Sequence, residues 1–127
     1  IKGLYSDGVI WINKNLSTPE KICILAEEIW HHHKSVGNIL NQKVISNRKQ
    51  EVQTRRWTYE YLIPLTSLIE AFKSGVRNQY ELAEFLNVPE SFVGQALQHY
   101  KSKYGLYKKV GQYTIQFEPL LILELCE

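Results

Sequence analysis

Residues Ala26–His33 hold the side chains of this sequence that are best suited to chemistry. On a helix, Glu27 and His31 are four positions apart and share a face, so a carboxylate oxygen and an imidazole nitrogen can converge on one ion. Glu28 projects beside that pair, as in the His-Glu-x-x-His metalloprotease helix, with Glu27 in the place of the first histidine. The spacing indicates a metal site. A Glu–His pair on a solvated helix face has the same spacing, however, and is only a small helix stabiliser.

The ligand types limit the choice of metal. Zn²⁺ accepts carboxylate oxygens as well as imidazole nitrogens. Replacing a histidine by Glu27 makes the site harder and more anionic, which weakens discrimination against Mn²⁺ and Fe²⁺. We therefore expect Zn²⁺ as the cofactor, with Mn²⁺ or Fe²⁺ as the alternatives.

A catalytic zinc also needs a third protein ligand and one position left open for water. Glu51, in the first turns of a second predicted helix, is a candidate, since the loop before that helix is long enough to turn it antiparallel to the first. Glu51 also suits the positive end of a helix dipole, and residue chemistry alone leaves both roles open.

Turn and capping signals define the elements that must position these residues. Asp7-Gly8 lies between aromatic and β-branched residues and predicts a β-hairpin over Leu4–Ile12. Ser17 and Glu20 have capping-box spacing and begin a helix that runs through about His33. The apolar periodicity predicts its buried stripe as Ile22, Leu25, Ala26 and Ile29.

The rest of the chain is predicted to be mainly helical. Gly, Asn and Pro residues mark its boundaries. In chain order we expect a loop over Ser35–Asn47, a helix from Asn47 or Arg48 to Pro64, a helix around Leu65–Lys73, a helix capped by Asn78, a helix over Pro89–Lys103, and a hairpin of Tyr107–Val110 and Tyr113–Phe117. The fold class is therefore α+β, mainly α, with a helix-turn-helix or winged-helix-like C-terminal half.

Composition and charge exclude several classes of protein. The chain has 127 residues with a formal charge of +2, and residues 78–127 carry four basic against six acidic side chains, so we do not expect nucleic-acid binding. No apolar run is long enough to span a bilayer, and we expect no membrane partner. We expect the two cysteines, Cys23 and Cys126, to be reduced thiols of a cytoplasmic protein. We expect Cys23 to be a small buried hydrophobic residue.

Two motifs together resemble the ImmA/IrrE family of metallo-endopeptidases, in particular its phage and prophage branch. The first is Cys23–His31. The second begins at Glu51 and closes with Leu62-Ile63-Pro64, similar to the family's Glu-x-x-Ala-Asn-x-Phe-Ala-x-x-Leu-Leu-Met-Pro helix, with Trp57 for the Phe. The likeness covers roughly residues 3–105.

The resemblance implies a zincin-like fold and a role for each matching residue. Glu27, His31 and Glu51 match the metal ligands, and Glu28 matches the general base that takes a proton from metal-bound water. It divides the chain into a metallopeptidase-like core, 1–64, and a helix-turn-helix-like region with a C-terminal hairpin, 65–127. The expected substrate is a repressor of a phage or mobile element, cut to release a genetic switch in the cytoplasm of a bacterial host.

Trp30 departs from the family pattern, which has a small glycine there. An indole needs far more room, so Trp30 implies either lost catalysis or a repacked helix edge. The sequence also lacks the family's helix before the hairpin and contains no methionine, and we expect a chain truncated at its N-terminus. The alternatives are a non-catalytic homologue that binds a repressor and a winged-helix DNA-binding protein. The oligomeric state stays open.

Overall fold

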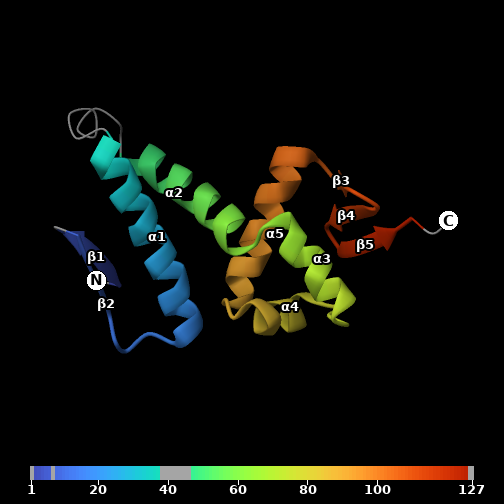
Figure 1. Cartoon of the computed structure of the whole chain (residues 1–127), viewed down its shortest axis with the longest axis horizontal. Coiled ribbons are helices and arrows are strands. Elements are labelled where there is room, and N and C mark those ends of the chain that lie inside the picture. Colours follow the sequence, from blue (N-terminus) through green and yellow to red (C-terminus); the bar gives the residue numbers. More distant parts are fainter. Residues whose placement is uncertain (1, 7, 38–46, 126–127) are drawn as a thin grey trace. The chain divides into compact units, whose positions relative to one another are not determined.

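The computed structural model describes residues 2–6, 8–37 and 47–125 (Figure 1). The chain divides into two compact units, Ile1–Leu62 and Ile63–Glu127, which are treated separately below. Of the predicted loop Ser35–Asn47, residues 38–46 lie outside the described part, as do Asp7 and Cys126. Of the helices that the structure describes, none combines the length and the apolar character that crossing a membrane requires.

The first unit consists of a hairpin and two helices. Its elements are β1 (Gly3–Ser6), β2 (Val9–Ile12), α1 (Thr18–Gly37) and α2 (Asn47–Leu62). The strands pair antiparallel from Gly3↔Ile12 to Ser6↔Val9. Gly8 has φ +79° in the two-residue connection, a conformation that glycine adopts without steric cost. The predicted hairpin and the predicted start of α2 are confirmed.

Helix α1 begins with the predicted capping box. The backbone N–H of Glu20 donates to Oγ of Ser17 (3.3 Å), and Oγ of Ser17 donates to Oε1 of Glu20 (2.9 Å). The hydroxyl and the backbone N–H of Ser17 both donate to the Glu20 carboxylate, and these two hydrogen bonds lower the pKa of Glu20 because they favour its charged form. The helix continues to Gly37, four residues beyond the predicted end at His33.

Small side chains form the buried seam between α1 and α2. Cys23 and Ala26 are buried on α1, and Thr54 and Thr58 are buried on α2. Each threonine hydroxyl donates to the carbonyl four residues earlier, at 2.7 Å, and so needs no partner on the other helix. The prediction that Leu25 belongs to the buried stripe is wrong. Its side chain is 40% exposed, because it lies one position off the Cys23–Ala26 face and so points about 100° away.

Strand β1 packs directly against α1 (Figure 1). A Cβ atom on Gly3 would overlap with Cγ2 of Ile24 and stand 3.5 Å from Oε1 of Glu28. The absence of a side chain at Gly3 therefore permits the close approach of hairpin and helix.

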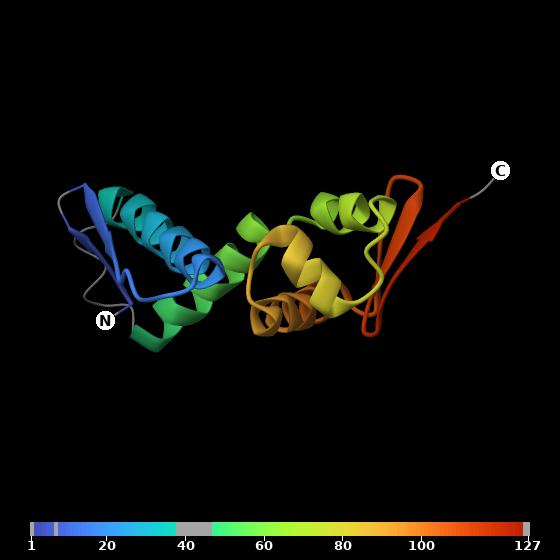
Figure 2. The same ribbon diagram turned by 90° about the horizontal axis from the view of Figure 1, so that it is seen from below.

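The second unit contains three helices followed by a three-stranded antiparallel sheet (Figure 2). Its elements are α3 (Leu65–Lys73), α4 (Gln79–Leu86), α5 (Glu90–Tyr104), β3 (Tyr107–Val110), β4 (Tyr113–Phe117) and β5 (Leu120–Glu124), with strand order β3-β4-β5. The predicted fold class, α+β and mainly α, is confirmed. Strand β5 was not predicted, although Leu120 and Ile122 alternate toward the core.

Local signals fix the helix boundaries in this unit. Oδ1 of Asn78 accepts the backbone N–H of Glu81 at 2.8 Å, which caps the start of α4 as predicted. Asn87 ends α4 in the left-handed conformation, with φ 57° and ψ 48°. Pro89 then occupies the N-cap of α5.

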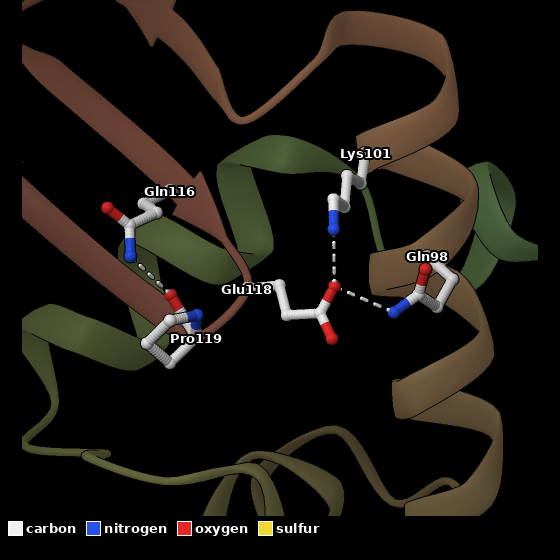
Figure 3. A network of polar contacts seen from close by, with 5 residues as sticks. All are labelled: Gln98, Lys101, Gln116, Glu118 and Pro119. Carbon is white, nitrogen blue, oxygen red and sulfur yellow. Dashed lines mark hydrogen bonds and ion pairs between the residues drawn. The ribbon is translucent and has the colours of Figure 1, made fainter.

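Glu118, between β4 and β5, joins the sheet to α5 (Figure 3). Its Oε2 accepts hydrogen bonds from Nζ of Lys101 (2.8 Å) and Nε2 of Gln98 (3.0 Å). The hydrogen bond from Lys101, followed by that from Gln98, lowers the pKa of the Glu118 carboxyl. In the same turn, Nε2 of Gln116 donates to the carbonyl of Pro119 at 3.0 Å.

Replacing Tyr100 by phenylalanine will destabilise the second unit. Tyr100 is 2% exposed and its hydroxyl donates to the carbonyl of Ile63 at 2.7 Å, so Tyr100→Phe leaves a buried acceptor unsatisfied. We expect a loss of about 1–2 kcal/mol in the free energy of unfolding, measured by urea titration with far-UV circular dichroism. Tyr107→Phe, at an exposed tyrosine, is the control and should change little. Equal effects of the two variants would contradict the assignment.

Candidate metal centre

Five residues from α1 and α2 line one cavity of about 290 Å³ in the first unit: Glu27, His31, Glu51, Thr54 and Arg55. The two helices run antiparallel (Figure 1), and helical spacing places Glu27 and His31 on one face of α1 and Glu51, Thr54 and Arg55 on one face of α2. His31, Glu51 and Arg55 are exposed, Glu27 is half-buried and Thr54 is buried. The cavity is therefore open to solvent, with Glu27 and Thr54 toward its base.

Glu27 is electrostatically the most perturbed carboxyl of this cavity. Partial burial raises its pKa, and the neighbouring carboxylate of Glu28 raises it further. The positive charges of His31, Arg55 and Lys2 act in the opposite direction. Desolvation outweighs these attractions, so the charged form of Glu27 is less favourable in the cavity than in water.

The three predicted ligands fit a divalent metal in chemical type but are not gathered as a finished ligand set. Two carboxylates and an imidazole are ligands that Zn²⁺ accepts, and all three line the same cavity. Within the described residues, however, no group of three or more His, Cys, Asp or Glu side chains is arranged to hold a metal ion. Metal binding would therefore require these side chains to move toward one another, and their role as ligands stays a prediction.

Glu28, the predicted general base, is not among the residues that line the cavity. It follows Glu27 on α1 and so points about 100° away, and its Oε1 lies on the side of the helix that faces Gly3 of β1. Its charge nevertheless acts on Glu27, so the two carboxylates are close neighbours. The predicted base thus lies beside the hairpin and outside the lining of the cavity.

Trp30 is accommodated by an aromatic stack on α2. Its ring lies 5.1 Å from that of Trp57, centroid to centroid, with an interplanar angle of 28°. Trp57 in turn stacks on Tyr61 at 4.5 Å and 13°. Trp57 and Tyr61 are four positions apart and share a face of α2. The helix edge that a glycine would leave open is therefore filled by aromatic packing.

The family model described as IrrE N-terminal-like domain matches residues 2–98 of this chain. The chain belongs to this family, the ImmA/IrrE metallopeptidase family. The matched region covers the first unit with its cavity and extends through α3 and α4 into α5. No curated protein and no solved structure matches the chain. Membership of this family indicates that the protein is metallopeptidase-like, and it implies a metal cofactor, typically zinc.

Two residues of the cavity were missed in the sequence. Thr54 and Arg55 follow Glu51 by three and four positions, and that helical spacing could have placed them beside it.

Cys23, a buried residue on the helix that carries Glu27 and His31, will resist alkylation. Burial raises the pKa of its thiol to about 12, and the charges of Glu27 and Glu20 add to the rise. At pH 8 its thiolate is therefore roughly a thousandfold scarcer than in the unfolded chain. Iodoacetamide labelling, followed at Cys23 by mass spectrometry, should be slower in native protein than in urea by about that factor. Equal rates would show that the thiol is accessible and unperturbed.

Replacing Trp30 by glycine, the residue typical of the family, will destabilise the first unit. Trp30→Gly removes the stack on Trp57 and adds a flexible residue to α1, and we expect a loss of about 2–4 kcal/mol. Leu25→Gly is the matched control, because Leu25 is an exposed position of the same helix and carries mainly the glycine penalty of about 1 kcal/mol. Tryptophan fluorescence during urea unfolding reports this unit selectively, since Trp11, Trp30 and Trp57 all lie in it. If both variants lose equal stability, the stack contributes nothing.

Proposed function

We propose that this protein is a zinc-dependent endopeptidase of the phage or prophage branch of its family. The observation that carries the proposal is the common cavity of Glu27, His31 and Glu51 in a chain of a metallopeptidase family. The side chains come from two helices separated in the sequence, so their presence around one cavity is a property of the fold. Mn²⁺ and Fe²⁺ are the alternative metals, because two carboxylates make the site hard.

In this proposal each residue has a separate task. Glu27, His31 and Glu51 hold the metal, which supplies Lewis acidity at the scissile carbonyl and acidifies water. Glu28 accepts the proton of the attacking water and returns it to the leaving amine nitrogen. Thr54 closes the base of the cavity without offering a charge, since its hydroxyl is bound to its own helix.

The hairpin is the element we propose for substrate binding. Strands β1 and β2 form a two-stranded sheet, so each has one edge without a strand partner in the described structure. An extended peptide can add to such an edge through main-chain hydrogen bonds. The position of Glu28 beside Gly3 of β1 supports this arrangement, because a peptide bound to the hairpin would lie near the proposed proton acceptor.

The proposed substrate is a repressor protein of a phage or mobile element, cut in the cytoplasm of a bacterial host. We assign the second unit, with its three helices and sheet, to docking of that partner. Its region 78–127 is net acidic, with six acidic and four basic side chains, which disfavours the phosphate contacts of a DNA-binding winged helix. A homologue that binds the repressor without cutting it would keep the same fold, and the experiment below separates the two.

Zinc content and cleavage will respond differently to the proposed ligands and the proposed base. Glu27→Gln, His31→Ala and Glu51→Gln should each weaken Zn²⁺ binding by more than the roughly 10- to 100-fold that the loss of an outer-shell partner costs. Glu28→Gln should keep its zinc and lose about 10²–10⁴-fold in cleavage rate. Zinc is measured by elemental mass spectrometry after dialysis, and cleavage on a proteome-derived peptide library.

His33→Ala is the control for His31→Ala, because His33 is exposed on the same helix and does not line the cavity. Wild-type protein that binds zinc without cleaving any peptide or a purified phage repressor would favour the non-catalytic homologue. Wild-type protein without zinc affinity would overturn the proposed function.

A further inference from the structure

A side chain with a permanent positive charge lines the cavity proposed for the metal. Arg55 lines it together with Glu27, His31 and Glu51. Its guanidinium stays protonated at every physiological pH. The structure shows no hydrogen bond from this guanidinium to another described residue. The fold therefore does not depend on hydrogen bonds donated by the N–H groups of Arg55.

The charge of Arg55 acts on the groups around it. It opposes the rise in the pKa of Glu27, and it opposes the rise in the pKa of Tyr59 that burial causes. Arg55 also follows Glu51 by four positions on α2, a spacing that allows attraction between the two charges. Arg55 therefore brings a fixed positive charge to the cavity that Glu27 and Glu51 line.

We propose that Arg55 is an internal counter-cation that weakens metal binding in this cavity. It balances Glu27 and Glu51 when no metal is bound, and it repels a divalent ion when one enters. This inference rests on the proposed function, because it assumes that the same cavity takes the metal.

The expected effect follows from Coulomb repulsion between a divalent ion and a guanidinium in a solvent-accessible cavity of this size. Screening by water reduces that repulsion, and removing the positive charge should tighten Zn²⁺ binding by roughly 10- to 100-fold. If Arg55 only shaped the cavity and its charge had no effect, removing that charge would not tighten Zn²⁺ binding.

The test compares Zn²⁺ affinities of metal-free full-length proteins, by titration against a chromophoric chelator. Arg55→Gln removes the charge and should bind Zn²⁺ at least about tenfold more tightly than wild type. Arg55→Lys retains a charge and should stay within about threefold of wild type. Arg56→Gln is the matched control, since Arg56 is an exposed neighbour on α2 that does not line the cavity, and it should leave the affinity unchanged. Far-UV circular dichroism verifies that each variant is folded.

The outcomes separate this inference from the proposed function. If wild type and Arg55→Gln bind Zn²⁺ equally, or Arg55→Gln binds it less tightly, Arg55 is not a counter-cation and only this inference fails. If Arg55→Lys binds as tightly as Arg55→Gln, charge is not the cause and the inference also fails. If neither wild type nor Arg55→Gln binds Zn²⁺, both the inference and the proposed metal site are overturned.

Discussion

The close packing of α1 against α2 is the constraint on which the first unit depends. Small buried residues, Cys23 and Ala26 on one helix and Thr54 and Thr58 on the other, make the seam. Because such side chains contribute little apolar area, the seam alone stabilises the unit weakly. The Trp30–Trp57–Tyr61 stack adds the large aromatic contact that the seam lacks. Together they hold the two helix faces that share the cavity.

The cavity places charges of both signs in a partly desolvated space. Glu27 shows the result most clearly, since burial raises its pKa although three positive side chains oppose the rise. Arg55 relieves part of that cost from within the chain, and a divalent metal would relieve more of it. If a metal binds as we propose, the cavity would be neutralised in two ways, and the two cations would compete for the same carboxylates.

The sequence predicted most elements because their boundaries carry local signals. Ser17 with Glu20, Asn78 with Glu81, and the turn glycine Gly8 each specify a boundary through hydrogen bonds or dihedral angles within a few residues. Strand β5 was missed because its pairing with β4 is a tertiary contact that follows a Pro-containing turn. Leu25 was misplaced because two neighbours cover α1 from different sides, which rotates the buried face away from the simplest apolar stripe.

The candidate site was predictable in part for the same reason. Helical spacing brought Glu27 and His31 together, and a family resemblance added Glu51. The same spacing could have placed Arg55 beside Glu51, but it could not place Arg55 beside Glu27 on the other helix. The resemblance also identified Trp30 as a departure from the family pattern, but it could not identify Trp57 as the residue on which Trp30 stacks. Only the packing of α1 on α2 reveals both, because each contact joins residues far apart in the chain.

The stacked indoles of Trp30 and Trp57 give the first unit an intrinsic spectroscopic signal that depends on its geometry. Two stacked chromophores on different helices couple their excited states, so their emission and near-ultraviolet dichroism depend on how far apart the helices stand. Anything that draws α1 and α2 together or spreads them would change that signal without an added label. Trp30, which departs from the family pattern, therefore gives this chain an intrinsic fluorescent reporter in the first unit.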